Sequence, residues 1–317
     1  MLPPSAPLVG EAAGLGTACL WVVTSLCFAA AGKRLGVSTL NLLRLLIAIV
    51  LLATTLRLTS GVWWPSPLTD QQLVLLAISG VVGLAIGDQA LFTAFVDIGP
   101  RLSLLLMTTA PIIAALLGWG FLGEQLTPLT LVGIAVTVSG VAWVIAERPA
   151  TGADVVRHPH HTRGVILAII GAACQAAGLM LSKAGMGHLD PSVPRVDPLA
   201  GTLVRAVFGV AALALVIVAL GKRMPRERNE RIKDQRTKGL TFAFMGAVFG
   251  PYLGVWLSLV AADNLPVGVA QTLMSLTPVL ILPVAAFALK ERISVRAVIG
   301  AVVAVAGVAL LFLEPSA

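Results

Sequence analysis

Long apolar segments separated by short polar breaks make up most of this chain. Each segment holds about 20 residues, enough for a helix to cross the roughly 30 Å hydrocarbon layer of a bilayer. Ten such segments can be placed, at residues 10–31, 37–59, 72–96, 102–122, 127–146, 164–186, 199–221, 238–262, 266–289 and 293–313. Because backbone groups inside lipid must be hydrogen-bonded within their own segment, the pattern predicts an all-α integral membrane protein with ten transmembrane helices.

The second half of this pattern repeats the first. Residues that recur at one constant offset are Met107 with Met274, Pro111 with Pro278, Glu124 with Glu291, Gly133 with Gly300, and Gly140 with Gly307. Upstream, Gly83 and Gly87 recur as Gly250 and Gly254 at the same offset. Similarity over such a long period indicates an internal duplication. We therefore divide the chain into a first repeat at 1–150, a polar linker at 151–163 and a second repeat at 164–317.

Each repeat contains an odd number of predicted spans, so the second repeat must enter the membrane in the opposite orientation to the first. The distribution of Lys and Arg agrees with this inversion. The break between the seventh and eighth spans is strongly basic, whereas the corresponding break after the second span is nearly free of basic residues. The positive-inside rule then places the odd-numbered breaks in the cytoplasm and both termini outside.

The overall composition agrees with a membrane protein. The chain is 57% hydrophobic and 12% charged, with a mean hydropathy of +0.95, whereas soluble domains carry about twice this share of charge. The net charge of +7 lies in the polar breaks, and no basic soluble domain that would bind nucleic acid is visible. Residues 1–14 contain no Lys or Arg, so we expect the first span to be retained rather than cleaved as a signal peptide. We expect a multi-pass protein of the cytoplasmic (inner) cell membrane, in contact with the lipid bilayer.

A proline interrupts one predicted span in each repeat. A proline inside a helix displaces the carbonyl four residues earlier, which here belongs to Met107 for Pro111 and to Met274 for Pro278. Hydroxyl groups stand beside both carbonyls, on Thr108, Thr109, Ser275 and Thr277. Interrupted helices at corresponding positions of two inverted repeats are typical of a transport site. The alternative is a structural kink whose carbonyls are bonded again by these hydroxyls or by neighbouring helices.

Arg44, Asp88 and Arg205 fall inside predicted spans and away from the span ends, where an unpaired charge is costly. Asp88 is the most informative, because Val255 takes its place in the second repeat. It is our candidate for coupling transport to a proton or cation, and the alternative is a structural pair with Arg44 or another donor. Arg44 and Arg205 are candidate contacts for an anionic substrate, and the alternative is contact with lipid phosphate near the membrane interface.

Other polar and aromatic residues complete the candidate site. The full set of predicted substrate-binding residues is Met107, Thr108, Thr109, Pro111, Gln175, Tyr252, Trp256, Gln271, Met274, Ser275, Thr277 and Pro278. Glu124 and Glu291 close the proline-containing spans, where a carboxylate favours the N-terminus of the following helix. A role in gating is the alternative for both.

Patterns typical of metal sites and enzymes are not found in the sequence. Cys19, Cys27 and Cys174 lie within apolar spans and have no paired spacing. Three histidines, His158, His160 and His161, lie in the linker, which we interpret as a flexible polar connection rather than a metal site. No nucleophile elbow, Walker A loop or H-E-x-x-H motif is present. We therefore expect no enzymatic activity, no cofactor and no ATP-driven pumping by this chain alone.

Residues 80–145 and their counterpart from Gly246 onward resemble the EamA-type members of the drug/metabolite transporter superfamily. Both segments have a glycine-rich span, a proline-centred span, a turn containing Glu and a span with spaced glycines, although Lys290 replaces the glycine of the second turn. The second and seventh spans match by placement and by Arg44 and Arg205.

This resemblance implies a ten-helix basket of two inverted repeats around a central cavity. It further implies secondary transport of a small metabolite by alternating access, such as an amino acid, nucleoside, sugar derivative or drug-like compound, with export expected. The alternatives are a lipid-headgroup flippase of the same fold and a non-transporting sensor or assembly subunit. Relatives are commonly drawn with both termini in the cytoplasm, which disagrees with the charge distribution found here.

Overall fold

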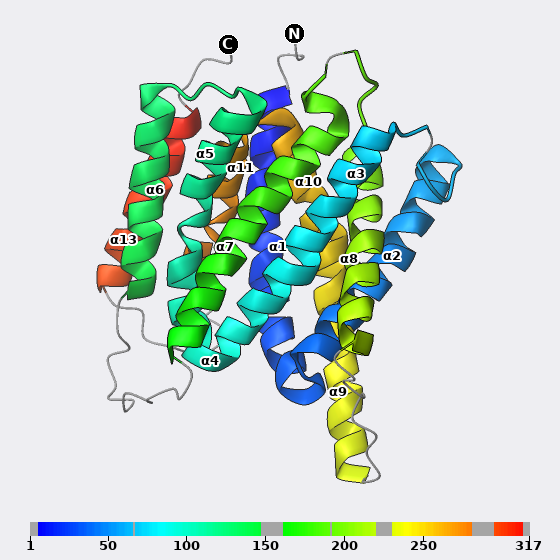
Figure 1. The fold of residues 1–317 in the computed structure, drawn as a ribbon. Helices are drawn as coiled ribbons and strands as arrows, with labels where there is room; N and C mark the ends of the chain where they lie inside the picture. The colour runs from blue at the N-terminus through cyan, green and yellow to red at the C-terminus, as the bar shows by residue number, and fades with distance from the viewer. Residues whose placement is uncertain are drawn as a thin grey trace.

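The computed structural model describes residues 6–65, 67–146, 161–190, 192–219, 230–280 and 295–312, and the regular elements in these ranges are helices (Figure 1). The elements are α1 (Ala6–Leu35), α2 (Val37–Ser60), α3 (Asp70–Ser79), η1 (Gly80–Gly87), α4 (Asp88–Met107), α5 (Ala110–Leu122), α6 (Pro128–Ala146), α7 (His161–Lys183), η2 (Ala184–His188), α8 (Pro198–Ala219), α9 (Glu230–Ala247), η3 (Val248–Gly254), α10 (Val255–Asn264), α11 (Val267–Met274) and α13 (Val295–Phe312). The η elements are wider, π-helical turns that continue the helices before them.

Among the described residues, six helical segments are long and apolar enough to cross a membrane. They are Pro7–Gly32, Val37–Ser60, Asp70–Ile98, His161–His188, Pro198–Ala219 and Arg236–Asn264. Four shorter apolar helices accompany them, at Ala110–Leu122, Pro128–Trp143, Val267–Leu280 and Val298–Leu311. Each predicted apolar window therefore contains a helix, and the prediction of an all-α membrane protein is confirmed. The total of ten crossings and the inverted relation of the repeats stay predictions.

The two ends of the bundle differ in charge. The start of α1 and the end of α13 lie at one end, called here the upper end, and the start of α9 lies at the opposite, lower end (Figure 1). Among the described residues, basic side chains at the lower end include Arg34, Arg163 and Arg236. The upper end has Arg57, Lys183 and Arg195. Which end faces the cytoplasm stays a prediction.

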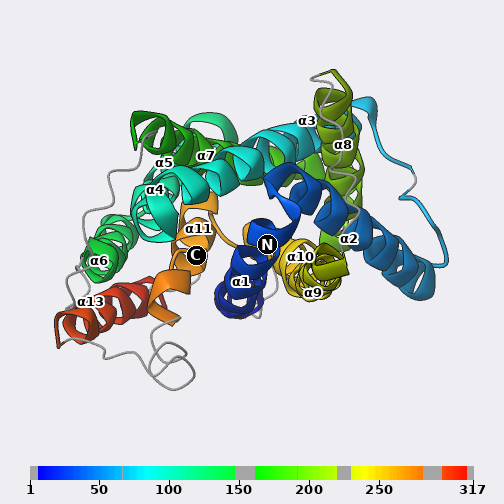
Figure 2. The same ribbon diagram turned by 90° about the horizontal axis from the view of Figure 1, so that it is seen from below.

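Glycines bring α6 of the first repeat and α13 of the second into close contact at one edge of the bundle (Figure 2). A Cβ atom on Gly140 would lie 2.4 Å from the backbone nitrogen of Ala304, and one on Gly307 would lie 2.4 Å from that of Thr137. Since no Cβ fits there, small residues are what allows these two backbones to approach.

The glycine pairs upstream serve the same purpose at the centre. A Cβ on Gly87 would lie 2.9 Å from the Cys174 side chain of α7, and one on Gly250 would lie 2.8 Å from the Thr24 side chain of α1. The glycine-rich segment of each repeat thus packs against the first helix of the other repeat.

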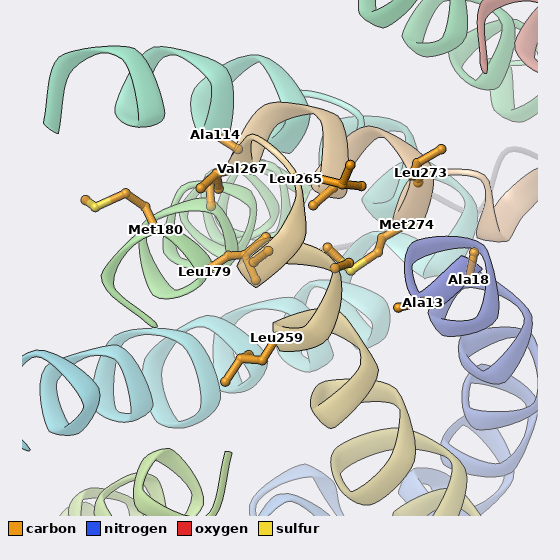
Figure 3. Packing of buried hydrophobic residues seen from close by; sticks show 14 of the residues in the cluster. Ala13, Ala18, Ala114, Leu179, Met180, Leu259, Leu265, Val267, Leu273 and Met274 are labelled. Atoms are coloured by element: carbon orange, nitrogen blue, oxygen red, sulfur yellow. The ribbon is translucent and has the colours of Figure 1, made fainter. Parts of the chain in front are cut away.

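The main apolar core joins the two repeats. Figure 3 shows buried residues of α1, α5, α7, α10 and α11 in one cluster, among them Ala114, Leu259, Leu273 and Met274. Leu273 has no exposed surface and packs against the position of Gly14 in α1. The core therefore holds α11 between α1 and α5, where one of the two proline-containing spans begins.

Candidate functional site

A cavity of about 730 Å³ lies between the two repeats. The first repeat contributes walls from α1, α2, η1 and α4, and the second contributes walls from α7, α8, η3, α10 and α11. The lining extends to Gly32, near the end of α1, and to Val37, at the start of α2, both at the lower end of the bundle. The cavity is of the size that binds small organic molecules.

The cavity brings together most of the residues singled out from the sequence. Those that line it are Arg44, Asp88, Met107, Thr108, Gln175, Arg205, Gln271, Met274, Ser275, Thr277 and Pro278. Thr109, Pro111, Tyr252 and Trp256 are not part of the lining. Tyr252 instead bonds through its hydroxyl to Thr55 Oγ1 at 2.8 Å and packs on the ring of Trp256.

Asp88 is the centre of a buried polar network. Its Oδ2 forms an ion pair with Arg44 Nη2, and its Oδ1 accepts a hydrogen bond of 2.7 Å from Gln175 Nε2. The structure thus shows the pair of Asp88 with Arg44 that the sequence offered as the alternative interpretation. Gln175, from the second repeat, is a further partner of Asp88. Pairing lowers the cost of holding this carboxylate inside the membrane.

Arg44 is held on several sides. Its Nε donates to Asn41 Oδ1 at 2.8 Å, one turn earlier in α2. Its guanidinium carbon lies 5.4 Å from the ring centre of Phe28 and 5.0 Å from that of Phe92. Cation–π contacts of this kind stabilise a desolvated cation. Arg44 is thus built into the first repeat rather than left near the interface for lipid phosphate.

Arg205 has a different environment. It is buried, with 4% of its surface exposed, and its Nε has no hydrogen-bond partner. In the described part of the chain no carboxylate lies within ion-pair distance of its side chain. Gly83 makes room for the guanidinium, because a Cβ there would lie 3.0 Å from Arg205 Nη2. The guanidinium therefore lies at the cavity wall without a protein anion to pair with.

Both proline-containing spans are interrupted, as predicted. In the first repeat α4 ends at Met107, and Pro111 lies in the first turn of α5, where a missing N–H costs little. In the second repeat α11 ends at Met274, and helix resumes at residues 277–280.

The expectation of a freed carbonyl in each copy needs correction for the second repeat. Thr277 Oγ1 donates to the Met274 carbonyl at 3.0 Å, so a neighbouring hydroxyl bonds this group again. In the first repeat Thr109 Oγ1 donates to the Leu106 carbonyl at 2.7 Å. Hydroxyl groups thus compensate part of the interruption, as the alternative interpretation held, while Met107 and Met274 still face the cavity.

A second ionic cluster lies at the upper end. Glu124 Oε1 accepts a bond of 2.6 Å from Lys183 Nζ in α7, and its Oε2 accepts one of 2.8 Å from the backbone N–H of Val267. Lys183 also donates to the Leu265 carbonyl at 2.7 Å. The Glu124 carboxylate therefore stabilises the N-terminus of α11, which belongs to the other repeat. The sequence predicts a different partner, the N-terminus of α6, which is the next helix along the chain. Its counterpart Glu291 lies outside the described residues.

Local sequence explains how Glu124 reaches across. Gly123 ends α5 in a left-handed conformation with φ of 67°, which glycine adopts without strain. The turn folds the carboxylate back over Gly118, where a Cβ would lie 2.2 Å from Glu124 Oε2. The Gly-Glu turn thus aims the carboxylate at α7 and α11.

A third contact lies beside this cluster. His188 Nε2 and Asp263 Oδ1 are 2.7 Å apart, and Arg195 Nη1 lies 3.6 Å from the same oxygen. They tie η2 and the loop before α8 to the end of α10. Like the pair of Glu124 and Lys183, they lie at the upper end of the bundle.

The sequence analysis did not identify Lys183 as a partner of Glu124. Its position at the last residue of an apolar helix was the available signal, because a lysine there needs a nearby anion or interface. Phe28 and Phe92 were also missed, since nothing in their spacing distinguishes them from core aromatics.

The described residues contain no group of three His, Cys, Asp or Glu side chains close enough to hold a metal ion. His158 and His160 lie outside them, as does most of the linker predicted at 151–163. Cys27 is buried, Cys19 is exposed and Cys174 lies between these extremes, each as a free thiol.

Comparison with known proteins adds to these observations. A solved structure titled "Crystal structure of protein" superposes with a TM-score of 0.72 at 19% sequence identity, over 98% of this chain and 98% of that one, so the two share a fold. A search of curated proteins found no match. The model of the EamA-like transporter family matches residues 8–146 and again residues 162–313. With both halves matched and nearly the whole length covered, this chain belongs to the EamA-like transporter family.

Proposed function

We propose that this protein is a secondary transporter of the cytoplasmic membrane that moves a small organic molecule by alternating access. The observation that carries the proposal is the central cavity, which both repeats line. A site between two repeats can open to either side when one repeat moves relative to the other. A non-transporting sensor would not need an interior space of about 730 Å³.

The substrate would contact the two interrupted helices. Met107 and Thr108 come from the first, and Met274 and Ser275 from the second, and all four line the cavity. Methionine side chains adapt to differently shaped apolar ligands. A short break in a helix also gives each of these segments a hinge at which it can bend.

The direction we propose is export. The lining reaches the lower end, where basic residues gather, and the positive-inside rule assigns that end to the cytoplasm. A cavity open to the cytoplasm and closed at the upper end is the state that loads a substrate for export.

Release on the other side requires the upper end to open. Opening separates Glu124 from Lys183 and from the start of α11, so the ionic cluster acts as the gate. Its bonds join α5, α7 and α11, which belong to different repeats, and a relative motion of the repeats breaks them together.

Asp88 is our candidate coupling group. Both of its oxygens are engaged, by Arg44 and Gln175, and a proton or cation that bound there would compete with these partners. Release of Gln175 would loosen a contact between the two repeats, which links ion binding to their motion.

Cysteine accessibility tests the proposed function. The native residues Cys19, Cys27 and Cys174 are replaced by alanine, and Ser275→Cys in the cavity is treated with a membrane-impermeant maleimide from each side of oriented vesicles. We expect labelling from the cytoplasmic side alone, and labelling from both sides once Lys183→Met weakens the gate. Ser60→Cys, exposed at the end of α2, serves as the marker for the outer side. Equal labelling of Ser275→Cys with and without the Lys183 substitution would overturn the proposed gate.

A further inference from the structure

The described side chains that line the central cavity carry more positive than negative charge. Among the described lining residues Arg44 and Arg205 carry positive charge, and Asp88 carries the negative charge. Asp88 is already committed, since Arg44 pairs with Oδ2 and Gln175 donates to Oδ1. Among the described lining residues one positive charge, on Arg205, therefore remains without a carboxylate of its own.

The surroundings of Arg205 leave its side chain available to a ligand in the cavity. It is 4% exposed, its Nε has no hydrogen-bond partner, and it lines the cavity. Buried charges in membrane segments are normally paired or face a functional cavity. The missing Cβ of Gly83 leaves space for Nη2. The described residues accommodate the guanidinium but place no carboxylate within ion-pair distance of it.

The internal duplication shows what is missing. The second and seventh spans each carry one buried arginine, Arg44 and Arg205. In the first repeat the following span supplies Asp88 to Arg44. At the same place in the second repeat stands Val255, which also lines the cavity. The second repeat therefore has a buried arginine in the corresponding span, six positions before Ala211, the counterpart of Arg44, and it lacks the carboxylate at the counterpart of Asp88.

We propose that the substrate supplies this carboxylate: the cavity binds an organic monocarboxylate, and Arg205 is its charge partner. The inference rests on the proposed transport function and names the substrate class of the same cavity. An arginine fork binds a carboxylate through two parallel hydrogen bonds. A single carboxylate also matches the single surplus charge, whereas a phosphate monoester with two negative charges would exceed it.

The remaining walls define the rest of the ligand. Trp21, Phe28, Phe92, Leu179 and Met274 give the cavity a largely apolar and aromatic surface. A positively charged group on the ligand would find no unoccupied carboxylate among the described lining residues, because Asp88 is fully engaged. The cavity thus fits a carboxylate attached to an apolar or aromatic body better than a zwitterion or a cation.

Calorimetric binding to the purified full-length chain in detergent tests this inference. The probes are 3-phenylpropionate, its uncharged alcohol 3-phenylpropanol, phenethylammonium and phenyl phosphate. They share an aromatic body and differ in the charged group. We expect 3-phenylpropionate to bind at least about tenfold more tightly than the other three, because a charge-assisted pair contributes that much. Tighter binding of the alcohol, the ammonium compound or the phosphate would overturn the proposal.

Substitutions of Arg205 test whether this residue causes the preference for 3-phenylpropionate. Arg205→Gln should weaken binding of 3-phenylpropionate by about tenfold or more and leave 3-phenylpropanol unchanged, whereas Arg205→Lys, which keeps the charge but loses the fork, should weaken it less. Arg57→Gln, an exposed arginine outside the cavity, is the matched control and should bind like the unmodified chain. Equal binding by Arg205→Gln and Arg57→Gln would contradict the assignment.

A second variant does not remove Arg205 at all. Val255→Asp restores in the second repeat the carboxylate that the first repeat has, so it should compete with the ligand and abolish binding of 3-phenylpropionate. Unchanged binding by this variant would refute the argument from the duplication.

If the anion binds through Arg205 but does not cross proteoliposome membranes, the transport function fails and the site stands. If a neutral or cationic compound is carried and the anion is not, the substrate class fails and the transport function stands.

Discussion

The two buried arginines of this protein lie in corresponding helices of the two repeats, α2 and α8, and have opposite surroundings. Arg44 has an ion pair with Asp88, a hydrogen bond to Asn41 and two aromatic rings beside it. Arg205 has an unpartnered Nε and no ion pair among the described residues. The surroundings of Arg44 fix its position. Those of Arg205 leave its positive charge available to pair with a bound anion.

This difference teaches how a duplicated fold gains a function. Each repeat gives the cavity one arginine, and the second repeat has Val255 where the first has Asp88, so in our proposal Arg205 is left for a ligand. The symmetric part of the sequence, the glycines and prolines, builds the frame. The asymmetric part, Asp88 against Val255, determines what the frame binds.

The largest expected effect comes from breaking the pair in the first repeat. Asp88→Leu leaves the Arg44 guanidinium buried without an anion, and removing one member of a buried pair costs about 3–5 kcal/mol. Thermal unfolding in detergent should show a strongly lowered Tm. Asp88→Asn, which keeps one acceptor oxygen for either Arg44 or Gln175 but loses the charge, should lie between this variant and the unmodified chain. A Tm unchanged by Asp88→Leu would mean that the pair is not structural.

The gate at the upper end should show a smaller loss. Lys183→Met removes the cation from Glu124, but the carboxylate keeps its bond to the Val267 N–H, so we expect a cost of about 2–3 kcal/mol, below the range for an anion or cation left without any partner. Glu124→Gln at the same cluster is the companion variant. A loss larger than that of Asp88→Leu would show that the closed end, and not the cavity pair, carries most of the stability.

The opposite sign is expected at the second arginine. Arg205→Met replaces an unpaired buried cation by an apolar side chain of similar length, and such replacements are neutral or stabilising by about 1 kcal/mol or more. Thermal unfolding without ligand should give an unchanged or raised Tm, whereas Arg44→Met should lower it. If both arginine variants lose stability equally, the contrast between the two sites is wrong.

The smallest effect on stability is expected at Gly83. The added methyl of Gly83→Ala meets the flexible end of Arg205 at 3.0 Å, so the guanidinium can shift and the cost should stay below about 1 kcal/mol. Gly80→Ala on the same segment meets the backbone carbonyl of Arg205 at 2.1 Å, which cannot move alone, and should cost more. Thermal unfolding ranks the two, and binding of 3-phenylpropionate should be weakened by Gly83→Ala, since its methyl displaces the ligand contact.

Much of the fold follows from the sequence because the lipid allows few solutions. Apolar length predicts the helices, and the recurring glycines predict close packing, which Gly140 and Gly307 show between α6 and α13. The placement of Pro111 and Pro278 predicts the interruptions of the two spans. These features depend on local chemistry that is visible in a short stretch of chain.

The site follows from the sequence only in part, because its contacts join residues far apart. Asp88 and Arg44 could be singled out as charges within the membrane, and their pairing was one of two alternatives. The bond from Glu124 to α11 of the other repeat could not be read from the sequence, which pointed to the adjacent helix. Tyr252 and Trp256 are aromatic and mid-chain like true lining residues, and only packing shows that they face Thr55 and each other.

The central claim is that the cavity carries a cargo whose negative charge meets Arg205. Its most direct test is uptake of radiolabelled 3-phenylpropionate into proteoliposomes preloaded with the unlabelled compound. The account predicts accumulation of label by the unmodified chain and by Arg57→Gln, and none by Arg205→Gln or Val255→Asp. Accumulation by Arg205→Gln at the rate of the unmodified chain, or none by the unmodified chain itself, would contradict it.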